Sequence, residues 1–371
     1  MSTPAQRLRK RIAAEGPIPF VELMAEALYG EGGYYRGEEI PIGTGGDFVT
    51  GSSLSPLFGQ ATAQLVRRLD ESLGRPADIL EVGYGCGLHL RSLLADLGES
   101  SERRIMAMDR VTRPLPDSIE VLEAWEELTA GALRGLIFSY ELFDALPVHR
   151  LIGTSERGVG ELWVDLDSHG EFRYVEGDLS DPALVECLGA GGTNLEPGQI
   201  ADVTPEWGPL YKRLAELLEC GLLVTCDYGF ERPKLFDPRV RRHGTLACYR
   251  RQRVHRDALS SVGEQDLTAH VDFTTLAEAG EAAGLETVAF TRQARWLLAC
   301  GLFDQLQQAD QKTRLEAMDL LAADGMGEEI RVLVQKKGLD TEAILDPEVL
   351  GGTGSARMPP RHGAAMDRQP S

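Results

Sequence analysis

The sequence predicts a mostly parallel, doubly wound α/β fold with a seven-stranded sheet, and three observations lead to this fold class. Short apolar runs alternate with helical stretches from residue 77 onward, as strands and helices do in such folds. A glycine-rich turn, Glu81-Val-Gly83-Tyr-Gly85-Cys-Gly87, follows an apolar strand and precedes an amphipathic helix at 88–97. The 371 residues suffice for one enlarged domain with an insertion or for two average domains.

Composition limits the classes of function. With 43% hydrophobic residues and a formal net charge of −20, the chain has the composition of a folded, acidic protein. It has no basic stripe interleaved with aromatic residues, so we expect no nucleic-acid partner. No run approaches the roughly 20 apolar residues that a membrane span requires, so we expect no membrane insertion.

The cysteines and the N-terminus predict a cytoplasmic protein. The six cysteines form no CxxC pair, no metal-finger spacing and no pattern beside a signal peptide, so they are expected to be reduced thiols. The basic stretch from Arg7 to Arg11 lacks an apolar targeting core, and a surface helix is the preferred interpretation over an organelle presequence.

The first segment, residues 1–75, is expected to be helical with a glycine-rich interruption. Helices are predicted at 20–28 and 55–73, the second of which starts at Ser55-Pro56. The loop at 30–53 is rich in glycine and also carries Asp47 and Phe48, which is unusual for a simple connector. The alternative is a flexible surface loop.

The sheet and its helices are expected to occupy residues 76–337. Strands are predicted at 78–82, 104–108, 118–122, 135–139, 222–226, 285–290 and 330–335, with helices before and after the strand at 285–290.

Two insertions are expected in this domain, at about 150–205 and 230–272. The first contains an alternating pattern on both sides of Asp167-Ser-His-Gly170, which predicts a β-hairpin over the sheet edge or a substrate cleft. Beyond Gly338 the apolar periodicity fails, so residues 338–371 are expected to be a disordered tail, with the segment past Leu350 the least structured.

The glycine turn is the strongest functional signal. Gly83, Gly85 and Gly87 let a ligand approach the backbone at the carboxyl end of the first strand. Their spacing departs from the dinucleotide fingerprint, and Glu81 suits a sulfonium cation better than a pyrophosphate. Asp109 ends the next strand, where a carboxylate accepts hydrogen bonds from ribose hydroxyls. These features predict an S-adenosylmethionine site; the alternative is a glycine turn without a cofactor.

The segment after the third strand is the expected contact for the adenine ring. Trp125 is predicted to stack on the ring and Glu126 to bind its amino group. Core packing is an equally good interpretation of Trp125, because a tryptophan after a strand often buries area alone.

Two carboxylates at the end of the fourth strand, Glu141 and Asp144, are the candidate catalytic residues. They are expected to orient a guanidinium and to aim one of its nitrogens at the sulfonium methyl group. A structural role is the alternative, in which Asp144 caps a short helix and Glu141 pairs with a surface arginine.

Further polar residues lie in segments without periodicity, and we find no metal site among them. Asp227 and Tyr228 follow the fifth strand, and His270 lies between two acidic residues. No second histidine lies at metal-ligand spacing, so a hydrogen-bonded loop histidine is preferred. The GxSxG elbow of a serine hydrolase is also missing.

Together these motifs resemble the MidA family, also called the DUF185 or COG1565 family, from residue 16 to about residue 335. The resemblance depends on the following matches: Gly33-Tyr-Tyr35, Gly46-Asp-Phe-Val-Thr50, Phe58-Gly59, Glu81-Val-Gly-Tyr-Gly85, Glu141-Leu-Phe-Asp-Ala-Leu-Pro-Val148, Asp227-Tyr-Gly229, Gly244-Thr-Leu246 and Asp266-Leu-Thr-Ala-His-Val-Asp-Phe273.

The resemblance implies a class I, Rossmann-like methyltransferase that uses S-adenosylmethionine. The mitochondrial branch of the family methylates an arginine in a complex I subunit. This chain departs from the family where Thr50-Gly-Ser-Ser53 lacks a glutamate, where the glycine loop contains Tyr84, Cys86 and Leu88, and where Tyr140 replaces an asparagine. These departures affect substrate identity more than cofactor binding.

We therefore expect a methyltransferase that acts on a protein arginine side chain. Two alternatives stay open: a methyltransferase of a small metabolite or modified peptide, and a catalytically silent assembly factor. The expected partner is a protein or small-molecule methyl acceptor, and a homodimer stays open. The acceptor is expected to contact residues from the family motifs: Asp47, Phe48, Thr50, Tyr140, Asp227, Tyr228 and His270.

Overall fold

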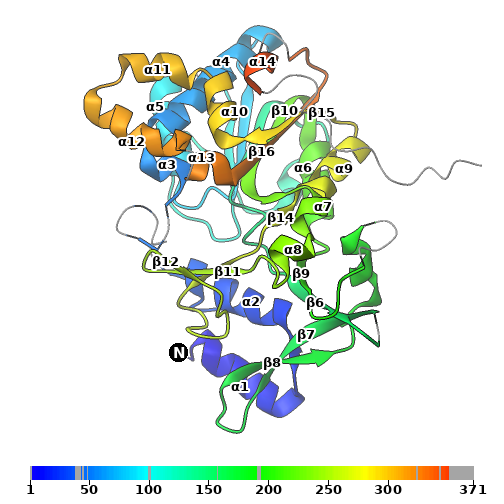
Figure 1. Ribbon diagram of the computed structural model, residues 1–371. Coiled ribbons are helices and arrows are strands. Elements are labelled where there is room, and N and C mark those ends of the chain that lie inside the picture. Colours follow the sequence, from blue (N-terminus) through cyan, green and yellow to red (C-terminus); the bar gives the residue numbers. More distant parts are fainter. Residues whose placement is uncertain are drawn as a thin grey trace, which may run out of the picture.

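A sheet with strand order β15-β16-β10-β5-β2-β3-β4 forms the centre of the molecule (Figure 1). The strands are β2 (Asp78–Val82), β3 (Ile105–Met108), β4 (Glu120–Leu122), β5 (Leu133–Tyr140), β10 (Leu218–Phe230), β15 (Glu286–Arg292) and β16 (Ile330–Lys337). Neighbouring strands from β4 to β10 pair in parallel, whereas β16 is antiparallel to both β10 and β15. The predicted mostly parallel, seven-stranded sheet is confirmed, and the two-residue strand β14 (Val271–Asp272) adds an eighth at the end of β10.

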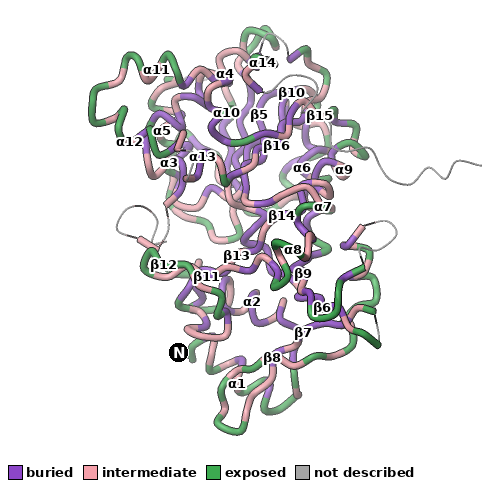
Figure 2. The backbone as a smooth tube through the Cα atoms, in the orientation of Figure 1, coloured by how far each residue is buried: buried purple, intermediate pink, exposed green. Residues whose placement is uncertain are grey.

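Helices cover both faces of this sheet because its side chains alternate between two apolar clusters. Ile79, Leu136 and Phe138 face one cluster, and Leu80 and Ile137 face the other. Figure 2 shows the resulting buried interior. The first cluster is covered by α4 (Leu57–Leu73), α5 (Leu88–Leu97), α10 (Gln293–Ala299), α11 (Leu302–Gln308), α12 (Gln311–Leu321) and α13 (Met326–Glu329), and the second by α6 (Trp207–Leu217) and α9 (Phe273–Ala282).

A smaller antiparallel sheet lies beside the main one, in the lower half of Figure 1. The predicted hairpin is present as β7 (Gly158–Leu166) and β8 (Phe172–Gly177), which pair from Leu166↔Phe172 outward. Strand β7 also pairs with β6 (His149–Thr154) and with β1 (Ile18–Pro19), and β6 pairs with β9 (Ile200–Val203). The insertion is therefore a five-stranded sheet that includes an N-terminal strand.

The N-terminal helices α1 (Pro4–Glu15) and α2 (Phe20–Tyr29) pack on this smaller sheet. The predicted surface helix at Arg7–Arg11 is part of α1, which buries Leu8 and Ile12 in the second apolar cluster. A buried ion pair supports this region: Arg150 Nε lies 3.0 Å from Asp202 Oδ1, and both side chains are at most 8% exposed.

The N-terminal segment before residue 75 consists of two parts that pack against different regions of the molecule. Residues 2–36, with the short helix η1 (Tyr34–Arg36), belong beside the smaller sheet, whereas α3 (Gly51–Leu54) and α4 pack against α5 and the main sheet. The expected boundary at residue 75 therefore does not coincide with the change in packing, because a loop without periodicity separates the two parts. The second insertion contains α7 (Arg232–Leu235), α8 (Pro238–Arg241), β11 (Ala247–Arg250), β12 (Arg253–His255) and β13 (Asp266–Thr268).

The computed structural model describes residues 2–37, 43, 46–47, 49–98, 102–156, 158–189, 194–322, 325–341 and 344–350. The packed core extends to α14 (Pro347–Leu350), because Ile344, Leu345 and Leu350 are buried in the first apolar cluster. The expected end of the core at residue 337 is thus too early, since these few apolar residues are too sparse to produce a periodic pattern. The expected disorder past Leu350, and Phe48, lie outside the described residues. Within these ranges no helix is both long and apolar enough to cross a membrane.

Candidate active site

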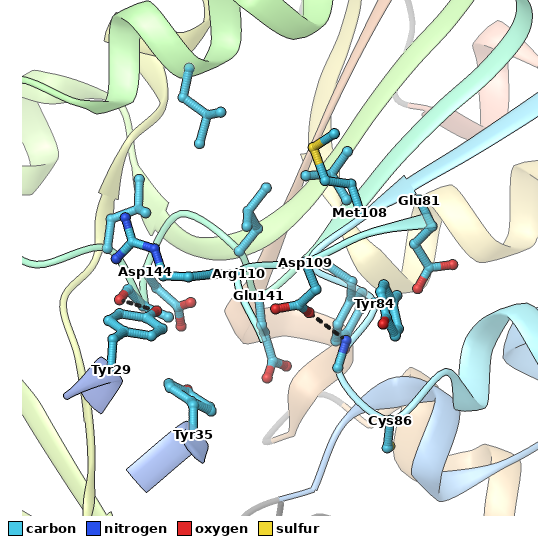
Figure 3. Close-up of a pocket in the computed structure, with 18 of the residues that line it drawn as sticks. Tyr29, Tyr35, Glu81, Tyr84, Cys86, Met108, Asp109, Arg110, Glu141 and Asp144 are labelled. Atoms are coloured by element: carbon cyan, nitrogen blue, oxygen red, sulfur yellow. Dashed lines mark hydrogen bonds between the residues drawn. The ribbon is translucent and has the colours of Figure 1, made fainter. Parts of the chain in front are cut away.

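A cavity of about 750 Å³ lies at the carboxyl ends of β2, β3 and β5. In open α/β sheets this edge is where ligands bind. Figure 3 shows its two sides: Glu81, Tyr84 and Asp109 lie on one, Tyr29 and Asp144 lie on the other, and Glu141 stands between them.

The glycine turn forms the first side. Gly83, Gly85 and Gly87 have φ values of 76°, 55° and 72°, a left-handed region that side chains disfavour. A Cβ on Gly83 would lie 2.9 Å from Leu142 Cδ1, and one on Gly87 would lie 2.3 Å from Leu115 Cδ2. Gly83 and Gly85 line the cavity and Gly87 begins the turn into α5. The turn therefore needs glycine at these positions.

Asp109, at the end of β3, is tied to this turn. The backbone N–H of Gly85 donates to Asp109 Oδ2 at 2.9 Å, and the N–H of Val111 donates to Oδ1 at 3.0 Å. Burial raises the pKa of Asp109, while these backbone donors oppose the rise. Each carboxylate oxygen can accept a second hydrogen bond, so capacity remains for hydroxyls of a ligand.

Glu81 lines the cavity from the end of β2 and is 3% exposed. Its Oε2 lies 2.6 Å from Nδ1 of His89, the second residue of α5. His89 also lines the cavity. The predicted acid is therefore paired with a histidine that the sequence analysis did not identify.

The two residues expected at an adenine ring are placed differently. Trp125, in η2 (Trp125–Glu127), lines the cavity and also packs on the second apolar cluster. Glu126 is exposed and does not line the cavity, whereas Glu123 does. The 3₁₀ turn reverses the chain after β4, which moves Glu126 outward.

These features fit S-adenosylmethionine as a cofactor. The cavity volume is within the range of about 300–1,000 Å³ for small-molecule sites. The glycine turn brings the backbone of Gly83 and Gly85 to the cavity wall without side chains, and the carboxylates of Glu81 and Asp109 suit a cation and hydroxyl groups.

Four carboxyl groups gather toward the other side: Glu141, Asp144, Asp227 and Asp266. Glu141 has a φ of 50°, rare for a residue other than glycine, and its Oε1 is buried without a hydrogen-bond partner among the described residues. Burial raises the pKa of Glu141 well above its usual value, and Asp227 and Asp266 add to the rise. Burial and Asp227 raise the pKa of Asp144 in the same way. These carboxyl groups are gathered at a cavity whose lining also includes the cationic side chains of Arg110 and Arg113.

Asp227 does not line the cavity and is fully buried behind it. Its Oδ2 accepts the N–H of Phe143 at 2.8 Å and its Oδ1 accepts its neighbour Tyr228's N–H at 2.8 Å. Burial raises its pKa to about 7 against these donors. The expected substrate contact is thus a support for the loop that carries Glu141 and Asp144.

Two tyrosines from the N-terminal segment complete the cavity. Tyr29 and Tyr35, here named the tyrosine wall, stack with ring centroids 5.5 Å apart and line the cavity. Tyr29 donates to the carbonyl oxygen of Ala145 at 2.8 Å, and Tyr35 donates to Asp266 Oδ1 at 2.8 Å. The guanidinium carbon of Arg110 lies 4.5 Å from the Tyr29 ring centroid, so this wall already holds one cation by its aromatic face.

Of the other expected substrate contacts, only Thr50 and Tyr140 line the cavity. The Tyr140 hydroxyl accepts the N–H of Gly51 and donates to Gln293 Oε1, each at 3.0 Å. Asp47 instead accepts hydrogen bonds from the Tyr34 hydroxyl and the Arg251 backbone.

Tyr228 and His270 stack on each other 6.4 Å apart, outside the cavity. Burial and Arg241 lower the pKa of His270 to about 4. The neutral ring therefore belongs to the packing beside β10.

The cavity also contains residues that the sequence analysis did not select: Tyr29, Tyr35, His89, Arg110, Arg113 and Asp266. Tyr35 and Asp266 lie inside motifs of the family resemblance, so the sequence could have identified them. Tyr29, Arg110 and Arg113 lie in no such motif. They reach the cavity through packing between segments that are distant in the chain.

Comparison with known proteins agrees with this architecture. Residues 57–291 match the family model described as "Putative S-adenosyl-L-methionine-dependent methyltransferase". The chain is similar to the mitochondrial protein arginine methyltransferase NDUFAF7 homolog of Drosophila melanogaster, with 26% identity over 76% of this chain and 70% of the relative. It is also similar to mitochondrial NDUFAF7 of Rattus norvegicus, with 28% identity over 74% of this chain and 69% of the relative.

A solved structure matches over most of the chain. A COG1565 superfamily member from Burkholderia thailandensis, bound to S-adenosyl-homocysteine, has a TM-score of 0.80 and 29% identity over 91% of this chain and 92% of that one.

Proposed function

We propose, from the premise that this chain belongs to the family of S-adenosyl-L-methionine-dependent methyltransferases, that it methylates an arginine side chain of a protein. The methyltransferase activity and the cofactor follow from the family. The acceptor is the proposed part, and it is supported by the protein arginine methyltransferases among the relatives and by the carboxyl groups of the cavity.

We assign different roles to the residues on the two sides of the cavity. We assign cofactor binding to the glycine turn, Glu81 and Asp109. When bound, S-adenosylmethionine supplies an electrophilic methyl group whose bonding electrons remain on sulfur as the methyl passes to the acceptor nitrogen. Glu141 and Asp144 have the chemistry to hold the planar guanidinium by charge-assisted hydrogen bonds.

The observation that carries the acceptor proposal is Glu141 Oε1, which is buried without a partner. Such an atom is costly unless a ligand donates to it. The raised pKa of Glu141 also makes this carboxylate a better acceptor for the proton that the nitrogen loses on methylation. The tyrosine wall fits the same acceptor, since aromatic faces bind guanidinium groups.

The test supplies methyl-labelled S-adenosylmethionine to a lysate with the purified protein. We expect label in protein and methylarginine after hydrolysis. Gly83→Val, which places a side chain at a φ of 76° against Leu142, should abolish labelling. Gly74→Val is the matched control, because Gly74 has a φ of 64° and no atom within 4 Å of a Cβ.

The outcome distinguishes the alternatives. Label in small molecules alone would contradict the arginine acceptor and would support a metabolite or modified peptide as the acceptor. If no label is transferred but S-adenosyl-homocysteine binds tightly in calorimetry, the result would support the third alternative, a catalytically silent factor that binds the cofactor without transferring its methyl group.

A further inference from the structure

The buried pair of Glu81 and His89 has a consequence for cofactor binding beyond the acceptor. His89 and Glu81 are 5% and 3% exposed, and the Nδ1 to Oε2 distance of 2.6 Å is short for a hydrogen bond. A carboxyl group buried in such a place needs a hydrogen-bond donor. The partner of the ring's other nitrogen indicates how His89 can supply that donor.

Nε2 of His89 lies 3.1 Å from the hydroxyl oxygen of Thr62. That hydroxyl also lies 3.2 Å from the carbonyl oxygen of Phe58, four residues earlier in α4. A ring that donates from Nδ1 to Glu81 can accept the Thr62 hydroxyl proton at Nε2. Both ring nitrogens then have a partner when Nδ1 carries the proton.

The ring is also held by packing. Its centroid lies 4.4 Å from that of Phe138 on β5 and 5.4 Å from that of Phe58 on α4. These contacts and the two hydrogen bonds hold Nδ1 against Glu81.

We propose that His89 is a positioning residue for the cofactor: its Nδ1–H donates to Glu81 and fixes the carboxylate in one orientation. Oε2 accepts from His89, so Oε1 remains for the cofactor. This inference depends on the cofactor, which the family establishes, and not on the arginine acceptor.

The first test reads the ligand-free protein directly. Histidine labelled with ¹⁵N reports by NMR whether each ring nitrogen carries a proton, and a His89→Asn variant assigns the signal. We expect Nδ1 of His89 to carry a proton. An unprotonated Nδ1 would overturn the proposal, and this result is independent of methyl transfer to any acceptor.

The second test measures S-adenosyl-homocysteine binding by calorimetry. His89→Leu should weaken binding about 10- to 100-fold, as expected for loss of a buried hydrogen bond to a carboxylate. His89→Asn retains an N–H donor near the position of Nδ1 and should recover most of the affinity.

His169→Leu is the matched control, since this exposed histidine lies in the β7–β8 turn. It should behave like the native protein. Equal affinities for His89→Leu and the native protein, or no recovery of affinity in His89→Asn, would contradict the positioning role. If His89→Leu does not fold, His89→Asn and the NMR result still decide the question.

Discussion

The hydroxyl of Tyr84 accepts the backbone N–H of Arg113 at 2.7 Å and donates to the backbone carbonyl of the same residue at 3.0 Å. Tyr84 lies in the glycine turn, and Arg113 follows Asp109. One side chain therefore fixes the spacing between the two segments that are proposed to bind the cofactor. Tyr84, which departs from the family pattern, therefore has a structural role.

Tyr84→Phe removes both of these hydrogen bonds and leaves the ring in place. Each such bond contributes about 1 kcal/mol, so we expect S-adenosyl-homocysteine to bind about tenfold more weakly in calorimetry. Tyr249→Phe is the control, because Tyr249 lies outside the cavity. Equal affinities for Tyr84→Phe and the native protein would show that the two segments hold their spacing without the hydroxyl.

Glu141→Gln should separate binding from methyl transfer. The amide keeps the shape of the side chain but loses the charge, so we expect arginine methylation to fall about 10- to 100-fold. The affinity for S-adenosyl-homocysteine should change little, since Glu141 lies between the two sides of the cavity. Glu126→Gln, an exposed change outside the cavity, serves as the control. Full methylation by Glu141→Gln would remove the proposed role of Glu141.

Stability and methyl transfer should respond to pH in opposite directions. Burial raises the pKa of Asp266 to about 6 and that of Asp227 to about 7, whereas an aspartate in an unfolded chain titrates near pH 4. A raised pKa in the folded state gives stability that is present below the unfolded value and lost as the pH rises through about 6 to 7. The melting temperature should therefore fall over this interval.

Methylation should rise as the pH passes about 6, because Asp266 lines the cavity and its ionised carboxylate favours a guanidinium there. Thermal unfolding and methylation rates, both measured against pH, test the two directions. Asp266→Asn removes one titrating carboxyl and should reduce the fall in melting temperature. A melting temperature that rises from pH 6 to pH 7 would contradict the assignment.

Arg150→Met should destabilise the smaller sheet. It leaves Asp202 buried without its ion-pair partner, which costs about 3–5 kcal/mol in comparable pairs. Urea unfolding measures this loss. Arg173→Met is the matched control: the Arg173–Asp165 pair has side chains 54% and 23% exposed, so about 1 kcal/mol or less is expected. Equal losses would show that burial of the Arg150 pair has no special effect.

The sequence predicted the sheet because its strands carry uninterrupted apolar runs, and it predicted the cofactor side because Glu81, the glycines and Asp109 are close together in the chain. It did not predict the tyrosine wall or the pairing of Ile18 with Val164, since these contacts join segments that are distant in sequence. Asp227 was misplaced for a related reason. An acid at a strand end points to a site, but only the fold shows whether it faces the cavity or the loop behind it.

The pairing of β1 with β7 also means that the N-terminal part of the fold cannot form completely until a much later segment has been synthesised. The tyrosine wall is translated before the rest of the cavity, and β1, next to its helix α2, has no partner strand until the hairpin at 158–177 has been made. Contacts between such distant segments form slowly, and apolar surface exposed in the meantime attracts chaperones or aggregates. The tyrosine wall is therefore the first part of the cavity to be translated and among the last to be assembled.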